Sequence, residues 1–394
     1  MEAGNRLGNG LTIQFPDEHL DPPSAGDDED YDDSLSDRRE VKLVEDGEDE
    51  LRLSHCVDSE DRGPSGAALV VDGVSRREAW LTLPHPRSGE TVRGEAGVAG
   101  AGVALVLTGI GDNDGPSGSP PRRASVVSER YRRVAVWECD TPDTGYTDAF
   151  SISESGGGSA AKHRGFEWDP VFSSSTTSDT PGFNGALINS EMHTLEENLV
   201  EGILDSPDEM RDIAAEHIPH LIVDGPIRKA VREYLSDNFP RGYVALNARR
   251  EMAPLPVGYI KTHRTQYLST EHHNLIPSLP DCYRSSLFHR PSRPHLYSAY
   301  LRLPSDVHDP LAGSWSGIVR VEIPAPDVGE AAPRMDAACR TLIALAGSKL
   351  RDGRAPRNLR PTASLESHLR HRLGDEKLAR RAMREAALKM PASK

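Results

Sequence analysis

Two short apolar runs, each ending in an Asp-Gly pair, constrain the fold of this chain more than any other feature. Residues 68–71 lead into Asp72 and residues 221–223 lead into Asp224, and a glycine follows each acid. Runs rich in β-branched residues predict buried strands, and the glycine lets the chain turn away. One Asp-Gly pair alone is an ordinary turn signal. Two matching copies indicate carboxylates aimed into a cleft, where they can share a hard divalent cation that prefers oxygen ligands.

A helix predicted over residues 189–204 supplies a third acid. Its apolar residues Met192, Leu195 and Leu199 recur at the spacing of one helical face, and Glu196 belongs to that face. An acid within an apolar stripe is costly unless something binds it, although a long side chain at the rim of a stripe also reaches solvent. Glu196 is therefore a candidate ligand beside the two aspartates.

Breakers are abundant and aromatic residues are scarce, which predicts long loops. The 394 residues include 34 glycines and 30 prolines, and 5% are aromatic. No apolar run reaches the length of a membrane span, and the N-terminus has no signal-peptide pattern. The cysteines form no CxxC pair, which argues against a zinc site or a disulfide framework. We therefore expect a cytoplasmic protein.

The net charge of −15 is unevenly distributed along the chain. Residues 1–66 hold 20 acidic and 6 basic side chains, so we expect a largely disordered acidic leader. Within it, only residues 11–15 and 41–44 are apolar enough to dock. Residues 335–394 hold 14 basic and 6 acidic side chains. Such a basic end binds phosphate or is simply a solvated helix surface.

Ordered structure is expected from residue 67 onward. The first strand is followed by a hairpin partner over residues 77–83, a small-residue strand with close backbone packing over 97–109, and a strand over 131–137. Residues 140–185 form a long loop or insertion. Further strands are predicted over 256–263, 297–303 and 318–323, and further helices over 208–217, 227–238, 335–350, 361–373 and 376–388.

The order strand-acid, strand, strand, helix-acid, strand-acid predicts an α/β fold with a mixed sheet flanked by helices. By analogy of topology, this order is similar to the ribonuclease-H-like fold, in which such acids meet at one edge of the sheet and hold two metals.

Seven short motifs carry a resemblance to a known family. They are VVDGV at Asp72, LEENL at Glu196, LIVDGPI at Asp224, PVGYIKTH at Lys261, YLRL at Arg302, VRVEIP at Glu322 and PTASLESHLRH at His368. In this set the chain resembles the NurA nucleases, which process DNA ends with the hexameric ATPase HerA. The similarity covers residues 67–390 in order, which would form the nuclease domain, with residues 140–185 as extra material.

The resemblance implies a DNA nuclease of the single-strand endonuclease and 5′-to-3′ exonuclease type, acting in end processing and double-strand break repair. It implies Mn²⁺, or Mg²⁺, in a two-metal site, and a homodimer that works with a HerA-like ATPase. Carried over by position, Asp72, Glu196 and Asp224 would be the catalytic metal ligands. His368 would be a further ligand or a proton carrier. The helix acid lies far ahead of the second aspartate, so other acids of that helix remain open as the ligand: Glu191, Glu197 and Glu201.

Four bases in or near these motifs are candidate phosphate contacts, or merely solvated charges: Lys261, Arg302, Arg320 and Arg360. Arg360 stands eight residues before His368, where the family usually has a tyrosine. This departure leaves open a catalytically degenerate module that binds DNA or a translocase. A ribonuclease-H-like enzyme acting on RNA also remains open, because no feature of the sequence recognises a ribose 2′-hydroxyl and so distinguishes RNA from DNA.

Overall fold

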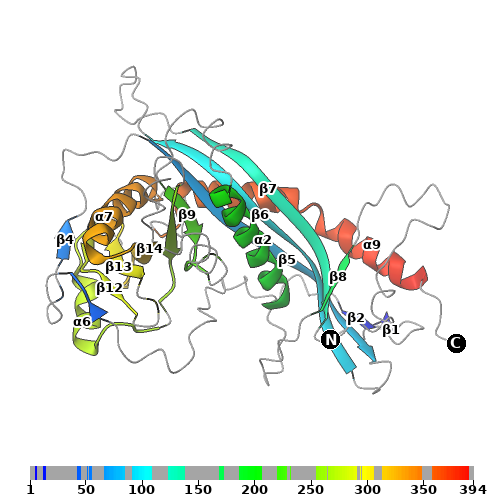
Figure 1. Cartoon of the computed structure of the whole chain (residues 1–394). Coiled ribbons are helices and arrows are strands. Elements are labelled where there is room, and N and C mark those ends of the chain that lie inside the picture. The colour runs from blue at the N-terminus through cyan, green and yellow to red at the C-terminus, as the bar shows by residue number, and fades with distance from the viewer. Residues whose placement is uncertain are drawn as a thin grey trace.

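The computed structural model shows a mixed sheet with helices on both faces, which confirms the predicted α/β class (Figure 1). The residues that the structure describes are 5–6, 12–14, 42–45, 51, 53–55, 66–84, 91–108, 123–137, 168–172, 186–205, 220–228, 231, 254–263, 265–290, 293, 295–305, 313–347 and 357–389.

Three long antiparallel strands form one half of the sheet: β5 (Gly66–Pro84), β6 (Thr91–Thr108) and β7 (Arg123–Trp137). Strands β5 and β6 pair along nearly their whole length, with one register shift between Arg77 and Ala79. No turn follows Asp72, although the first Asp-Gly pair predicts one, because Asp72 lies opposite Gly102 inside the paired strands β5 and β6. The prediction of a separate hairpin partner over residues 77–83 is therefore wrong, since those residues continue β5.

The sheet becomes parallel beyond β5. Strand β9 (His220–Asp224) lies between β5 and β10 (Leu255–Ile260) and runs parallel to both. The chain then turns at Gly225, whose φ of 103° favours glycine. Gly225 exchanges two backbone hydrogen bonds with Tyr259, at 2.8 and 2.9 Å. The turn predicted after the second Asp-Gly pair is confirmed.

Antiparallel strands extend the sheet beyond β10. The predicted pair is confirmed as β13 (Leu296–Arg302) and β14 (Ile318–Pro324). Next to β13 lie β12 (Phe288–His289) and β11 (Tyr283–Ser285). At the opposite end β8 (Asp169–Phe172), which comes from the predicted loop over residues 140–185, pairs with β7.

Parts of the acidic leader dock on this sheet as short strands. The two segments expected to dock contain β2 (Thr12–Gln14), which pairs with β5, and β3 (Lys42–Leu43), which pairs with β12. Two further strands complete these edges: β1 (Asn5–Arg6) beside β2, and β4 (Leu53–His55) beside β11. Glu45 also forms a salt bridge with the buried Arg284 at 2.7 Å. The rest of the leader lies outside the described residues.

Helix α2 (Ala186–Asp205) covers one face of the sheet, and α7 (Val328–Leu345) and α8 (Arg360–Arg372) cover the other (Figure 1). The alternation of side chains along β5 sets this division. Leu69 and Val71 share a core with apolar residues of α2, whereas Val70 shares a core with α7.

The remaining helices follow the predictions in part. Helix α9 (Glu376–Lys389) follows α8 after Gly374, and two short elements, α6 (Thr270–Leu275) and the 3-10 helix η3 (Ile276–Ser278), lie near β11. Helix α7 begins earlier than predicted, because Asp327 caps it, and it also ends earlier, at Leu345. The helix predicted over 208–217, and most of that over 227–238, lies outside the described residues. No helix in the described part of the chain is long and apolar enough to cross a membrane.

A buried ion-pair network fixes the C-terminal end of α8 to the sheet. The Glu78 carboxylate accepts hydrogen bonds from Arg76, Arg133 and the Trp168 indole at 3.0–3.1 Å. The same two arginines donate to the carbonyl of Leu373 at the end of α8. Positive side chains at the C-terminal end of a helix also interact favourably with the helix dipole. Helix α8 is thereby held across β5 and β6.

The small-residue run in β6 gives the close backbone packing that the sequence predicts. A Cβ at Gly97 would lie 2.6 Å from the Arg76 carbonyl oxygen, and one at Gly102 would lie 3.1 Å from both Leu365 and Leu369 of α8. Glycine at these positions therefore lets the neighbouring backbone and α8 approach the strand.

We expect Gly97→Ala to destabilise the protein by about 1–3 kcal/mol, because the added Cβ meets backbone that cannot yield as a side chain can. The measurement is the midpoint of urea denaturation. Gly202→Ala is the matched control, since nothing lies within 4 Å of a Cβ at this helical position. It should stabilise the protein by up to about 1 kcal/mol. Equal effects of the two substitutions would contradict the packing of β6.

Candidate functional site

The parallel pairing of β5 with β9 brings Asp72 and Asp224 together, as the sequence predicts. Val71 lies opposite Val223, so the two acids are the next pair along the strands. Asp72 is buried, at 5% exposure. Its Oδ1 accepts a hydrogen bond from the Gly73 amide at 2.9 Å, whereas its buried Oδ2 has no hydrogen-bond partner in the described structure. An unpartnered carboxylate oxygen in the interior indicates a site for a ligand.

The acids lie at a gap in one edge of β5. Strand β9 ends at Asp224, and β2 pairs with β5 only from Trp80 onward. Residues 72–79 of β5 have no described strand on that edge. Side chains from both faces of the sheet can therefore meet beside Asp72.

Glu196 reaches this gap from α2. A Cβ at Gly73 would lie 2.8 Å from its Oε1, so glycine is what allows the carboxylate to approach the strand beside Asp72. Glu196 is buried at 3% exposure, and its Oε2 lies 2.8 Å from His193 Nδ1. Among the alternative helix acids, Glu191 instead pairs with Arg132 at 3.0 Å.

A fourth acid, Glu366, approaches from the opposite face on α8. Its neighbour Leu365 packs over Gly102, which is the cross-strand partner of Asp72. The sequence analysis missed Glu366, although its place inside the motif around His368 could have drawn attention to it. The site thus gathers acids from two strands and from helices on both faces.

This environment raises the pKa of Asp72 well above its usual value. Burial is the main cause, and the negative charges of Asp224, Glu196 and Glu366 add to it. Lys261 acts in the opposite direction. Its ammonium pairs with Asp224 and lies 3.4 Å from Asn358 Oδ1. Lys261, predicted as a phosphate contact, is therefore a partner of the acids.

The donor atoms of this site are carboxylate oxygens, the type of ligand that a hard divalent cation prefers. Asp72 offers a buried carboxylate oxygen with no hydrogen-bond partner, beside the carboxylates of Asp224 and Glu196. Within the described residues, however, no three His, Cys, Asp or Glu side chains are grouped closely enough to hold a metal. The Lys261 ammonium supplies a positive charge at Asp224.

The structure does not bring His368 to the acids. Its exposed ring places Nε2 2.7 Å from Glu129 Oε2 on β7, and Arg372 pairs with the same carboxylate at 2.9 Å. Glu129 lies opposite Gly102, so β6 separates it from Asp72.

The predicted phosphate-contacting arginines serve other groups. Arg302 donates to four backbone carbonyls of the neighbouring loops, and the buried Arg320 pairs with Glu322 at 3.2 Å. Their placement does not support a role in substrate binding, because their donors face the protein. Arg360 is exposed at the start of α8, where its Nε donates to the Ala346 carbonyl at 2.7 Å.

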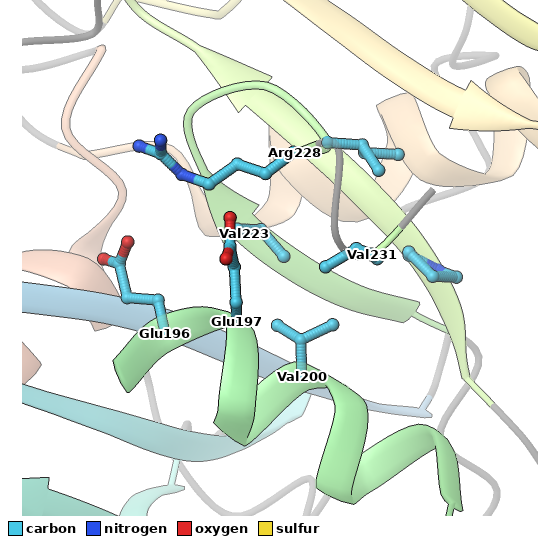
Figure 2. Close-up of a pocket in the computed structure, with 8 residues that line it drawn as sticks. Glu196, Glu197, Val200, Val223, Arg228 and Val231 are labelled. Atoms are coloured by element: carbon cyan, nitrogen blue, oxygen red, sulfur yellow. The ribbon is translucent and has the colours of Figure 1, made fainter. Parts of the chain in front are cut away.

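A pocket adjoins the acids between α2 and the chain that follows β9 (Figure 2). Glu196 and Glu197 extend from α2 toward this chain, and Arg228 lies above them. Burial raises the pKa of Glu197, and the charge of Arg228 opposes that rise. Arg228 was also missed from the sequence, where it follows the second aspartate by four residues.

Comparison with known proteins names no relative: no protein-family model matches the chain, and a search of curated proteins finds no match.

We expect Asp72→Asn to raise the stability of the protein at pH 7–8. A carboxyl with a raised pKa keeps its proton in the folded state at a pH where the unfolded chain has lost it, so stability falls as pH rises above the usual value of 3.8. The substitution removes this loss, on the order of 1 kcal/mol or about 2–4 °C in Tm, and the gain should shrink toward pH 4. Thermal unfolding from pH 4 to pH 8 is the measurement.

The control for this substitution is Asp169→Asn, at an exposed surface ion pair with Arg132. It should change Tm little at any pH. An Asp72→Asn variant that is less stable than the parent at pH 8 would contradict an uncompensated acid in the site.

Proposed function

We propose that the chain is a ribonuclease-H-like nuclease of the NurA type, which hydrolyses phosphodiester bonds in DNA with a divalent metal. The observation that carries the proposal is the buried Asp72, with an unpartnered Oδ2, beside Asp224 and Glu196 at a gap in the sheet edge.

The topology supports the proposal. A first acid comes from the central strand of the sheet, a second from the helix that precedes β9, and a third from the end of β9 itself. This order of acids along the chain is the one that the resemblance implies, and in the structure the acids lie at the gap beside β5. The argument from topology is one of analogy.

In this proposal Asp72, Asp224 and Glu196 would hold Mn²⁺ or Mg²⁺. When bound, such a metal would polarise the phosphoryl group and activate water. The chain's own residues prepare the site: Gly73 makes room for Glu196, and the turn at Gly225 aims Asp224. Lys261 supplies a positive charge that reduces repulsion between the acids. The proposal includes the implied partners, a HerA-like ATPase and a second copy of the chain.

A second candidate is a non-catalytic module that binds DNA or a translocase. The observation that favours it is the ion pair between Lys261 and Asp224, which neutralises a proposed ligand. Metal affinity separates the candidates. Titration of Mn²⁺ followed by electron paramagnetic resonance should show binding that Asp72→Asn removes if the acids are ligands.

We expect the purified protein to digest end-labelled single-stranded DNA when Mn²⁺ is present and not when it is chelated. Asp72→Asn and Asp224→Asn should each reduce the cleavage rate by at least about 100-fold, because loss of a direct ligand exceeds the usual effect of its outer-shell partners. The folded state is checked by circular dichroism. His368→Ala tests whether the exposed histidine takes part. Near-normal cleavage by either aspartate variant would refute this active site.

A further inference from the structure

The pocket beside the acids contains a cation that the proposed mechanism does not use. Its lining is mostly apolar, and its charged lining residues are Glu196, Glu197 and Arg228 (Figure 2). The apolar lining residues are Val200, Val223, Ile227, Val231 and Pro256. Since Glu196 belongs to both, the pocket is continuous with the acid cluster.

The backbone that carries Arg228 is fixed from several directions. Gly225 is bonded to Tyr259 through two backbone hydrogen bonds, and the Ile227 amide donates to Glu322 Oε2 at 3.2 Å. Glu322 is itself buried and pairs with Arg320. A side chain on such a segment starts from a defined position, which is what a binding site needs.

The side chain of Arg228 is half-buried, yet its guanidinium has no hydrogen bond or ion pair within the part of the chain that the structure describes. Its charge acts on Glu197 in the same pocket, but no hydrogen bond joins it to either carboxylate there. Its five N–H donors therefore remain available to an anion.

A phosphodiester strand needs such a cation here. The acids that surround Asp72 repel phosphate, and the nearest ammonium, that of Lys261, is already paired with Asp224. A planar guanidinium binds phosphate oxygens in pairs and is always charged. The apolar side chains that line the same pocket lower the dielectric, which strengthens the attraction.

We propose that Arg228 binds the phosphate next to the one that lies at the acid cluster, and so positions a single nucleic-acid strand across the gap in β5. This inference rests on the proposed function for its substrate class. It assigns Arg228 to binding and positioning, separate from the bond-breaking step.

The test is direct binding of a fluorescent single-stranded oligonucleotide, measured by anisotropy without divalent metal at several salt concentrations. Arg228→Ala should weaken binding about tenfold, as expected for a hydrogen-bonded charge. It should also reduce the slope of log affinity against log salt by about 0.7, the value for one phosphate contact on a single strand. Arg228→Lys should keep the slope and recover only part of the affinity, because an ammonium cannot bind in the paired mode.

The matched control is Arg93→Ala, which removes the same charge from an exposed position near the far end of β6. It should leave the affinity within about twofold, by the ordinary size of a surface effect. Equal losses in both alanine variants, or an unchanged salt slope in Arg228→Ala, would overturn the inference.

Cleavage assays separate this inference from the proposed function. If the protein is a nuclease, Arg228→Ala should raise KM about tenfold and leave kcat within about threefold, because it removes binding that is shared by substrate and transition state. DNA binding that depends on Arg228 in a protein without Mn²⁺-dependent cleavage would refute the nuclease and retain the binding site. No DNA binding by the unsubstituted protein would refute the role of Arg228.

Discussion

The parallel pairing of β5 with β9 is the constraint on which the rest of the site depends. It places the buried Asp72 beside the half-buried Asp224, where like charges are expensive. The Lys261 ammonium pairs with Asp224 and so offsets part of this repulsion. The turn at Gly225 is held by Tyr259, and the Tyr259 hydroxyl donates to the Arg357 carbonyl just before α8. The acids are thus tied to the helix that covers them.

The acid site uses both faces of the sheet, which is unusual for side chains that must meet. Asp72 is on the α8 side of β5, whereas Glu196 comes from α2 on the other side. The meeting is possible because Gly73 has no side chain and because no described strand pairs with residues 72–79 on that edge of β5. A single methyl group at residue 73 would collide with Met192 and with the Glu196 carboxylate.

Sequence patterns predicted the acids and the strands that carry them, because the spacing of apolar residues along a strand or helix is a local signal. The turn after Asp72 was mispredicted, since a turn dipeptide can be absorbed into a strand when its neighbour β6 continues to pair with it. Glu366 and His368 show a second limit. Which side of α8 faces the acids depends on how Leu365 packs over Gly102, and the sequence of α8 alone does not specify that contact. The roles of Arg302 and Arg320 likewise depend on loops and a buried acid that are distant in sequence.

Short strands of the acidic leader cover two strand edges of the sheet. Strand β3 is a terminal strand of the sheet and has only two residues, and β2 covers part of the edge of β5. Exposed strand edges are templates for pairing with other chains, and very short, charged edge strands suppress such pairing. A shortened chain that begins at residue 67 would expose the edges of β5 and β12 to other molecules. In the described structure β2 and β3 therefore shield these two edges from pairing with other chains.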